Sequence, residues 1–394
     1  MLNHERSIPR SEELRKKVAF LRPEKSVLII LLLLVAFYLY QIRPVSSSTI
    51  LVPAQYPTIQ AAVDYAAVGD TIQVAQGIYY EHINVNKSVT IAGANPQTTI
   101  IDGTANGTIF ELDGSNIYIS GFTIRNAGNS GNAISSEKST LTSDNHQINN
   151  NIITTSQYGV FLTYSASNKI FSNTFINNVF AGICVNLAGS TNITANTIVG
   201  SPYGIKTTSS TNNIIIGNTI SQDSFAIYLS SASTGNTVRN NVLYGKTACI
   251  YSSSDSTTVD HNTLLDGATG VYLYNTHSGS IYYNTCKNSS YGIRLYNPSA
   301  ITSSHTVSNN KILYTDWAIE LTYSDGNTLT GNWLQQNTYG IYMSASSPNT
   351  FYRNNFVNNK MQVYAGTGSN SWSATISKKN YGNYWSDYTG RDTN

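Results

Sequence analysis

The chain has 394 residues, of which 40% are apolar and 11% are charged, and its formal net charge is +2. This length can bury a large core, while the lack of a basic footprint or nucleic-acid motif excludes the usual cationic nucleic-acid-binding proteins. Few charges together with 28 tyrosines and 3 cysteines favour an extracellular protein with a polar, uncharged surface and no disulfide framework.

The first predicted element is an uncharged apolar run from Val27 to Ile42, which follows basic residues at 15–17, 22 and 25. Because basic flanks stay in the cytoplasm, we expect residues 1–26 to be a cytoplasmic tail and 27–42 a transmembrane helix that anchors the chain. The alternative is a cleaved signal peptide, which would make the protein secreted. In both cases the chain after a linker at 43–49 lies outside the cytoplasm.

Residues 50–128 are expected to form a capping helix followed by irregular coils. Pro57 suits the first position of a helix, and Ile59, Val63 and Ala66 share one face of it. A short amphipathic helix of this kind is placed to cover the open end of a solenoid core. A polar insertion loop at 129–147 separates these coils from the regular ones.

Residues 148–364 repeat one pattern. An Asn recurs at spacings of 21 to 26 residues, and a small residue follows each about eight positions later. A period in the low twenties predicts a solenoid. We expect each Asn to lie in a tight corner, to tolerate the left-handed conformation there, and to bond the equivalent Asn of the next coil. The recurring residues are Asn151, Asn173, Asn196, Asn218, Asn241, Asn262, Asn284, Asn310, Asn332 and Asn354.

Apolar residues alternate around each Asn in a way that predicts three short strands per coil, with three inward-pointing positions. These positions lie three residues before the Asn, two after it, and directly after the small residue. Ile193, Ile215 and Val238, for example, are expected to lie one above another. Coils stacked about 4.8 Å apart would join such residues into one core. The predicted fold class is therefore all-β, a parallel β-helix of about 22-residue coils.

Two segments resemble known families. Residues 52–103, beginning VPAQYPTIQAAVDYAAVGDTIQV, resemble the N-terminal coil of pectin-lyase-like β-helix proteins. The Asn-rich repeats followed by NYGNYWSDYTGRDTN resemble the NosD-like family, which includes periplasmic accessory proteins of nitrous oxide reductase and many surface proteins. The resemblance covers nearly everything after Val52 and implies a right-handed β-helix. It does not fix the function, because such repeats are structural.

Residues 365–394 are expected to form a C-terminal cap, with Tyr384 and Trp385 covering the last coil. The alternative is that Asp387, Asp392 and Asn394 begin a calcium site, since hard cations need several oxygen ligands.

Exposed positions after the small residues form a row rich in tyrosine. Tyrosines with one cation and one anion would suit the binding of sugar rings. The alternative is that tyrosines of neighbouring strands simply stack on one another. The candidate carbohydrate-binding residues are Tyr272, Tyr274, Arg294, Tyr296, Glu320 and Tyr342.

Carboxylates give little support for catalysis. Asp223 and Asp266 lie two coils apart at nearly the same register and are a candidate pair for polysaccharide cleavage, whereas Asp260 is expected to form a surface ion pair with Arg239. We therefore predict no catalytic residue. A polysaccharide lyase or hydrolase of the pectin-lyase-like group is the first alternative function.

Metal binding is the second alternative, which the resemblance to NosD-like proteins brings with it. His261, His277 and His305 fall at different registers and do not form a cluster, and Cys184 alone of the three cysteines is expected to point outward. We therefore expect no metal site and no cofactor, with copper handling as the alternative.

The sequence thus predicts an extracytoplasmic β-helix that acts as a non-enzymatic surface or binding protein. We expect it to contact the membrane through Val27 to Ile42 and to bind a polysaccharide or glycan, with no nucleic acid as partner.

Overall fold

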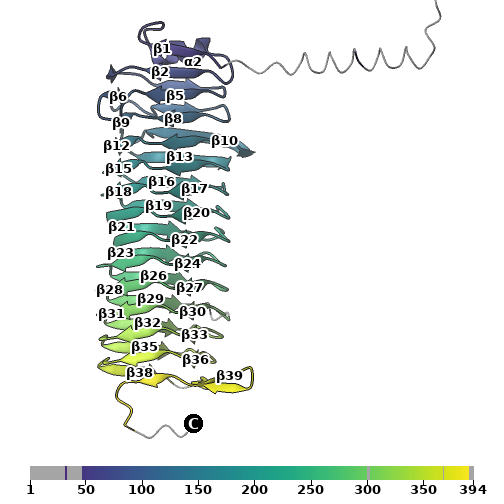
Figure 1. The fold of residues 1–394 in the computed structure, drawn as a ribbon, viewed down its shortest axis with the longest axis vertical. Helices are drawn as coiled ribbons and strands as arrows, with labels where there is room; N and C mark the ends of the chain where they lie inside the picture. The colour runs from purple at the N-terminus through teal and green to yellow at the C-terminus, as the bar shows by residue number, and fades with distance from the viewer. Residues whose placement is uncertain (1–31, 33–46, 300–301, 367, 390–394) are drawn as a thin grey trace, which may run out of the picture. The chain divides into compact units, whose positions relative to one another are not determined.

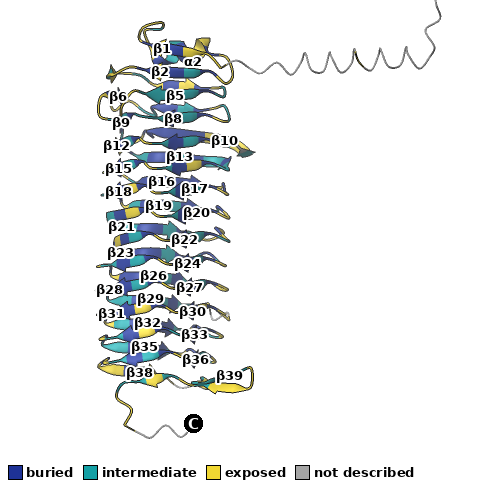
Figure 2. Cartoon of the chain, in the orientation of Figure 1, coloured by how far each residue is buried: buried dark blue, intermediate teal, exposed yellow. Residues whose placement is uncertain are grey.

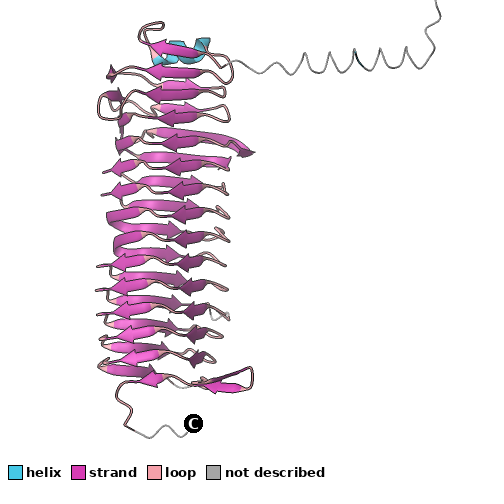
Figure 3. Ribbon diagram, in the orientation of Figure 1, coloured by secondary structure: helices cyan, strands magenta, loops and turns pink. Residues whose placement is uncertain are grey.

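The protein is a right-handed parallel β-solenoid of about 14 coils, seen in a computed structural model that describes Leu32 and residues 47–299, 302–366 and 368–389 (Figure 1). Almost every described element is a strand, as Figure 3 shows. Each coil contributes three strands, and each strand pairs in parallel with its equivalent in the next coil. The predicted β-helix is therefore confirmed.

The first strands of successive coils form one sheet of 14 strands. They are β1 (Thr49–Val52), β2 (Thr71–Val74), β5 (Thr90–Gly93), β8 (Tyr118–Ser120), β11 (Gln147–Asn149), β14 (Lys169–Phe171), β17 (Asn192–Thr194), β20 (Ile214–Ile216), β22 (Thr237–Arg239), β24 (Thr258–Asp260), β27 (Ser280–Tyr282), β30 (Thr306–Ser308), β33 (Thr328–Thr330) and β36 (Thr350–Tyr352).

The second strands form the next column. They are β3 (Gly77–Tyr79), β6 (Thr99–Asp102), β9 (Thr123–Gly128), β12 (Ile152–Ser156), β15 (Thr174–Ile176), β18 (Thr197–Val199), β25 (Thr263–Leu265), β28 (Thr285–Lys287), β31 (Lys311–Leu313), β34 (Trp333–Gln335), β37 (Asn355–Val357) and β41 (Tyr384–Trp385).

The third strands form the column that carries the candidate site. They are β4 (Ile83–Val85), β7 (Phe110–Leu112), β10 (Ile134–Ser143), β13 (Tyr158–Ala166), β16 (Ala181–Asn186), β19 (Tyr203–Thr208), β26 (Thr269–Tyr274), β29 (Tyr291–Tyr296), β32 (Trp317–Thr322), β35 (Tyr339–Ser344) and β38 (Met361–Ala365). Two long strands, β21 (Thr219–Leu229) and β23 (Val242–Ser252), run through the second and third columns without a break.

The one helix of the described residues is α2 (Ile59–Tyr65). It begins two residues later than Pro57 would place it, because Thr58 is the N-cap and its hydroxyl accepts a hydrogen bond from the Ala61 amide at 3.1 Å. Ile59 and Val63 are fully buried in the same core as the strands. None of the described helices is long and apolar enough to cross a membrane. The predicted anchor at 27–42 lies outside the described residues except for Leu32.

The core is a set of vertical rows of apolar side chains. Ile193, Ile215 and Val238 pair in register on β17, β20 and β22, as the repeat predicted, and all three are inaccessible to solvent. Burying each of them stabilises the fold by about 1.5–3 kcal/mol. Figure 2 shows buried residues alternating with intermediate and exposed ones along the strands. Each coil has four inward positions rather than the predicted three, since a further buried row runs from Val85 and Leu112 to Leu162 and Val185.

The recurring asparagines form a continuous ladder, as predicted. The side-chain amide of each donates to the side-chain oxygen of the next, at distances from 2.9 to 3.2 Å. The same oxygen also accepts from the backbone amide of the preceding Asn, for example from Asn218 to Asn241 at 2.8 Å. The ladder ends at Asn383, 29 residues after Asn354.

The predicted left-handed conformation of the ladder asparagines is wrong by one residue. The ladder asparagines are not among the positive-φ residues, whereas the residues directly before them are, including Ser172, Asn240 and Gly217. The preceding residue makes the corner turn, and the Asn itself is free to point inward and bond its neighbours.

Both ends of the repeat differ in detail from the prediction. The segment 129–147 contains β10, which pairs with β7 and β13 and carries an irregularity between Glu137 and Thr142. After the last regular coil, β39 (Ala374–Ile376) and β40 (Lys379–Tyr381) form an antiparallel hairpin. Trp385 stacks on the core residue Phe356 with ring centroids 4.3 Å apart.

We predict that replacing one ladder residue, Asn241→Ala, lowers the free energy of unfolding by about 2–4 kcal/mol. The change leaves the buried Asn218 amides without their acceptor, and each unsatisfied buried group costs about 1–3 kcal/mol. Denaturant unfolding followed by circular dichroism measures it. Asn355→Thr is the control, because Asn355 lies on the outer side of β37 in a row where β28 and β25 have Thr. An equal loss in the two variants would contradict the role of the ladder.

Candidate functional site

The outer side of the third strand column carries the candidate site, which we call the aromatic strip. Its side chains contact one another from coil to coil in two runs of rings. The first run comprises Tyr158, Phe161, Phe180, Tyr203, Phe225, Tyr228, Tyr251, Tyr272, Tyr274, Tyr296 and Tyr323. The second comprises Tyr291, Trp317, Tyr339, Tyr342 and Tyr364.

Arg294 lies at the junction of the two runs. Its guanidinium carbon is 5.0 Å from the ring centroid of Tyr272 and 5.4 Å from that of Tyr296, in the first run. It is also 4.7 Å from the ring of Tyr291, in the second run. Contacts of this length are cation–π interactions, worth about 0.5–2 kcal/mol each according to exposure.

An ion pair holds Arg294 in this position. Its Nε lies 2.5 Å from Oε2 of Glu320, whose other carboxylate oxygen accepts a hydrogen bond from the Thr322 hydroxyl at 3.0 Å. The Glu320 side chain is only 9% exposed, against 27% for Arg294. The pair is therefore largely shielded, and the arginine is the partner that reaches solvent.

The structure brings the six candidate residues together on adjacent strands. Tyr272, Arg294, Glu320 and Tyr342 follow one another in register on β26, β29, β32 and β35. Tyr274 and Tyr296 pair beside them. All of them are half-buried except Glu320, which is buried.

Several rings of the strip stack face to face along the axis of the solenoid. Tyr342 and Tyr364 are 4.8 Å apart and within 7° of parallel, and Tyr228 and Tyr251 are 4.7 Å apart at 11°. Because this separation equals the coil spacing, their faces cover each other and their edges meet solvent. The expected alternative of tyrosine stacking on tyrosine is thus observed for these rings. Around Tyr272 the geometry differs, since its ring is perpendicular to that of Tyr251, at 87°.

Burial raises the pKa of two phenols at the centre of the strip above its ordinary value of 10. It raises the pKa of Tyr251 to about 12, with the neighbouring phenols Tyr228 and Tyr272 adding to the effect. Burial likewise raises the pKa of Tyr272, while Arg294 opposes that rise. Neutral phenols both donate and accept hydrogen bonds, so the strip offers hydroxyl groups rather than charges.

Sequence reasoning missed one row of the strip, which lies directly before the small residues. Tyr291 and Tyr339 belong to it, together with Trp317. A signal for it exists in the repeated Tyr-Gly pair at Tyr158, Tyr203, Tyr291 and Tyr339. The glycine has no side chain and so adds nothing to the inner rows. The tyrosine before it points outward.

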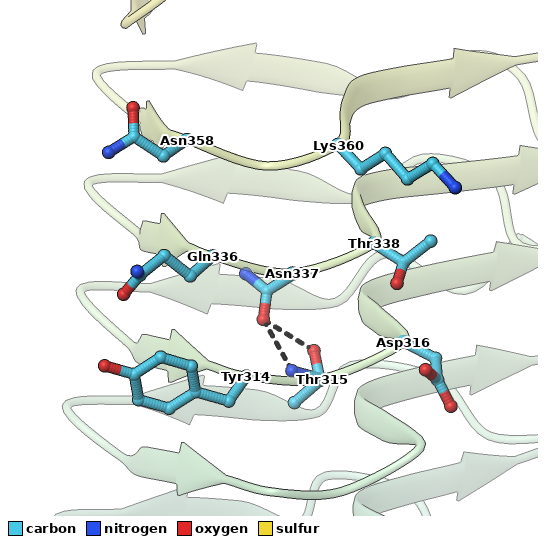
Figure 4. Close-up of a pocket in the computed structure, with 8 residues that line it drawn as sticks. All are labelled: Tyr314, Thr315, Asp316, Gln336, Asn337, Thr338, Asn358 and Lys360. Atoms are coloured by element: carbon cyan, nitrogen blue, oxygen red, sulfur yellow. Dashed lines mark hydrogen bonds between the residues drawn. The ribbon is translucent and has the colours of Figure 1, made fainter.

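A polar groove borders the strip at the corner between the second and third strands (Figure 4). It has a volume of about 470 Å³. Its lining residues come from three successive coils, and Figure 4 shows them in two rows that project to either side of Thr315 and Asn337. One row is Tyr314, Gln336 and Asn358, and the other is Asp316, Thr338 and Lys360.

The two carboxylates considered for catalysis, Asp223 and Asp266, each accept a hydrogen bond from a neighbouring coil. Asp223 is buried and occupies a second ladder, five residues after the main one, where its Oδ1 accepts a hydrogen bond from the Ser201 amide at 2.5 Å. Asp266 is exposed and accepts from the Asn288 side chain at 3.1 Å. A buried ladder residue and an exposed one do not flank a common bond, so the structure gives this pair no catalytic geometry.

The ion pair between Asp260 and Arg239 exists, at 2.7 Å, but it is not a surface pair on both sides. The Asp260 side chain is fully buried, whereas Arg239 is 44% exposed. Asp260 also contacts Nδ1 of His261 at 2.9 Å. This carboxylate therefore organises two neighbouring side chains.

His305 is not available as a ligand. It is buried in a third ladder, five residues before the main one, and its Nδ1 accepts a hydrogen bond from the Gly279 amide at 2.9 Å, as an asparagine oxygen would. Burial lowers its pKa to about 4, so it is neutral at pH 7. His146 occupies the same ladder and likewise accepts from the Ile117 amide, at 3.3 Å.

Cys184 lies on the outward row, as predicted, but it is covered by its neighbours and only 4% exposed. Burial raises its pKa to about 12, which keeps the thiol protonated. In the described part of the chain, no three His, Cys, Asp or Glu side chains lie close enough together to hold a metal ion.

An ionisable group that the sequence did not single out is Glu111, at the N-terminal end of the same outward row. It pairs in register with Ser135, which in turn pairs with Phe161 of the strip. Burial raises the pKa of Glu111 to about 7, and the nearby carboxylates Glu137 and Asp113 add to the rise. A shifted carboxyl of this kind is suited to proton transfer near neutral pH.

Comparisons with known proteins agree with this architecture. Residues 63–249, 179–317 and 244–390 match the family described as periplasmic copper-binding protein (NosD). No curated protein matches the chain in sequence.

Solved structures share the fold at low sequence identity. An N-terminal fragment of gene product 12 of bacteriophage Phi29 is 12% identical, with a TM-score of 0.59, covering 79% of this chain and 68% of that one. The alginate lyase AlyF-OU02 is 12% identical, with a TM-score of 0.52 and coverage of 85% and 90%. The catalytic domain of a GH87 α-1,3-glucanase is 14% identical, with a TM-score of 0.52 and coverage of 87% and 70%.

We predict that Asp223→Asn stabilises the protein at high pH and not at low pH. Burial raises the pKa of Asp223 to about 7, above its ordinary value of 3.8, so the folded state binds the extra proton and loses stability as pH rises from about 4 to 7. Asparagine does not titrate, and its amide would replace the unpartnered Oδ2 as Asn337 does when it donates to the Ile312 carbonyl.

At pH 8 the free energy of unfolding should rise by up to about 4 kcal/mol, and the gain should fade at pH 4.5. Denaturant unfolding at both pH values measures it, with Asp266→Asn as the exposed control. A gain of equal size at the two pH values would show that ionisation of Asp223 is not its cause.

Proposed function

The chain belongs to the NosD family of β-helix proteins, and from this premise we propose that it is an extracytoplasmic surface protein that binds carbohydrate without cleaving it. The family is described as periplasmic, which is consistent with a location outside the cytoplasm. The proposal includes the membrane anchor at Val27 to Ile42 and a capping role for α2 at the N-terminal end of the core.

The position of Arg294 carries this proposal. A guanidinium has five N–H donors, and the ion pair with Glu320 engages the side of the Nε. The remaining donors lie among three tyrosine rings whose hydroxyls can both donate and accept hydrogen bonds. Fixed donors beside phenol groups match a ligand that is rich in hydroxyls.

The remainder of the strip suits a long ligand. On the outward rows from Tyr158 to Tyr364 the charged residues are Lys206, Arg294 and Glu320, so most of the surface is aromatic or hydroxyl-bearing. Lys206 lies 4.9 Å from the rings of Phe180 and Tyr203, which resembles the setting of Arg294. A polymer lying along the axis would meet similar groups at each coil.

We predict that the double variant Tyr272→Ala, Tyr296→Ala reduces retention of polysaccharide by about tenfold or more. It removes two of the three rings around Arg294, each worth about 0.5–1.5 kcal/mol in contacts. Affinity electrophoresis in gels containing single polysaccharides measures it. The control is Tyr282→Ala, Tyr352→Ala, which removes half-buried tyrosines from β27 and β36 on a different sheet. Unchanged retention in the strip variant would refute this site.

Polysaccharide cleavage is the alternative that a specific observation favours, namely the raised pKa of Glu111 at the end of the strip. An assay for products released from the polymer decides between the two functions. A binding protein leaves the polymer intact, whereas release of reducing ends or unsaturated uronate that Glu111→Gln abolishes would establish an enzyme.

Copper handling rests on the description of the family rather than on a cluster of ligands. The described residues offer copper single exposed imidazoles. They are His82, His261 and His277, and because Thr108, Asp260 and Asp255 contact their respective Nδ1 atoms, Nε2 is the nitrogen available to a metal in each.

We therefore expect any Cu(II) bound by the described part of the chain to be lost when the three exposed imidazoles are removed together, in His82→Ala, His261→Ala, His277→Ala, and to be kept in His305→Asn. His305 is buried and its Nδ1 already accepts a hydrogen bond, and asparagine fills the same ladder position in the next coil at Asn327. Calorimetric titration with Cu(II) measures both. Binding that survives loss of all three imidazoles would place the ion elsewhere.

A further inference from the structure

We propose that the polar groove beside the strip is a second carbohydrate subsite, which binds an oligosaccharide segment of two or three sugar units. This inference rests on the proposed function because it takes the same class of ligand, carbohydrate, but it involves no residue of the aromatic strip. The groove spans three coils, from β31 to β38, has a volume of about 470 Å³ and is open to solvent, so a ligand would lie along the surface rather than be enclosed.

Tyr314 provides an aromatic surface that the strip lacks. Its side chain is 54% exposed, and the ring contacts found among the described residues do not include it. The rings of Trp317 and Tyr339, in contrast, cover each other at 6.2 Å and 5°. A sugar ring can therefore lie against Tyr314 without displacing another aromatic group.

The opposite wall of the groove carries two charged side chains that are not neutralised by an ion pair. Asp316 and Lys360 are both exposed, and neither takes part in the ion pairs of the described residues. They stand two coils apart, about 9.6 Å at the usual strand spacing, with Thr338 between them. The carboxylate can accept bonds from sugar hydroxyls, while the ammonium can donate to a hydroxyl or a carboxylate.

The floor of the groove is rigid and already satisfied. Asn337 accepts hydrogen bonds from the amide and the hydroxyl of Thr315, at 2.9 and 2.8 Å, and donates to Asn359 at 2.9 Å. The ladder thus fixes the separation of the two walls before any ligand arrives, which lowers the entropic cost of binding. Selection of the ligand is left to the wall side chains.

The chemistry of the walls excludes an apolar ligand. Gln336, Asn358 and Thr338 offer amide and hydroxyl groups, and Tyr314 is the only aromatic residue in the lining. The groove also joins the strip, since Asp316, Thr338 and Lys360 directly precede residues of the strip column, among them Trp317 and Tyr339. One glycan chain can therefore occupy both surfaces.

The test uses the full chain and titrates it with neutral oligosaccharides of two to six units and with uronic-acid oligosaccharides of the same lengths, monitored by calorimetry. We expect Tyr314→Asn and Asp316→Asn each to weaken binding about fivefold or more. Tyr283→Asn is the matched control, because Tyr283 is 53% exposed, at a corner with φ of 56° against 57° for Tyr314. Asparagine adopts this conformation readily and occurs at the same corner position as Tyr314 in Asn288.

The variants separate this inference from the proposed function. Oligosaccharide binding that is lost in the Tyr272/Tyr296 variant but unaffected by Tyr314→Asn and Asp316→Asn would overturn the groove and leave the strip. Loss in the groove variants alone would support the groove and refute the strip, and absence of binding to every glycan would overturn both. Lys360→Gln then identifies the ligand, since selective weakening of the uronic-acid series means that Lys360 binds a carboxylate, and equal weakening means a hydroxyl.

Discussion

The structure depends on one hydrogen-bonding arrangement at the corners of its coils. Parallel strands satisfy the backbone within each sheet, but an amide at a corner needs another acceptor, and an unpaired buried amide is costly. Here a side-chain oxygen of the next coil fills that need, and in the main ladder the Asn amide group also bonds the following Asn. The inner rows of isoleucine and leucine provide most of the hydrophobic stabilisation. The ladders fix the register between successive coils.

This constraint explains why unusual residues occur where they do. His305 and Asp223 each present an acceptor at a ladder position where other coils, such as those of Asn327 and Asn337, present an asparagine oxygen, so the fold accepts them despite the cost of burying a titratable group. Their shifted pKa values follow from that position. The shifted pKa values of these two residues thus follow from the ladders, whereas Glu111, a carboxyl with a raised pKa on the outer face, lies in register with the strip.

The sequence predicted the repeat, the register and the main ladder, because a period that recurs ten times averages out local exceptions. It did not reveal the two flanking ladders, whose members vary between Asn, Ser, Thr, His and Asp, and so it treated His305 and Asp223 as free side chains. The candidate rows were likewise placed correctly by register, since Tyr272 and Arg294 are adjacent. What register does not specify is the side-chain torsion. The stacking of Tyr342 on Tyr364 and the perpendicular ring of Tyr272 depend on rotamers that packing selects.

A solenoid locked at its corners repeats its outer surface at a fixed spacing, and for the proposed carbohydrate-binding role this geometry favours polymers over compact ligands. Each coil offers few contacts, so a single sugar would bind weakly. A polymer aligned with the axis would contact many coils while losing its translational and rotational entropy only once. Arg294 places a charged group of fixed orientation among the tyrosines of the strip. Thr322 orients Glu320 through a hydrogen bond, and Glu320 orients the guanidinium through the ion pair. Such a group can set the register of a bound polymer along the strip. The groove at Tyr314, held open by the flanking ladder of Thr315 and Asn337, lies a coil or two farther along and can set its direction.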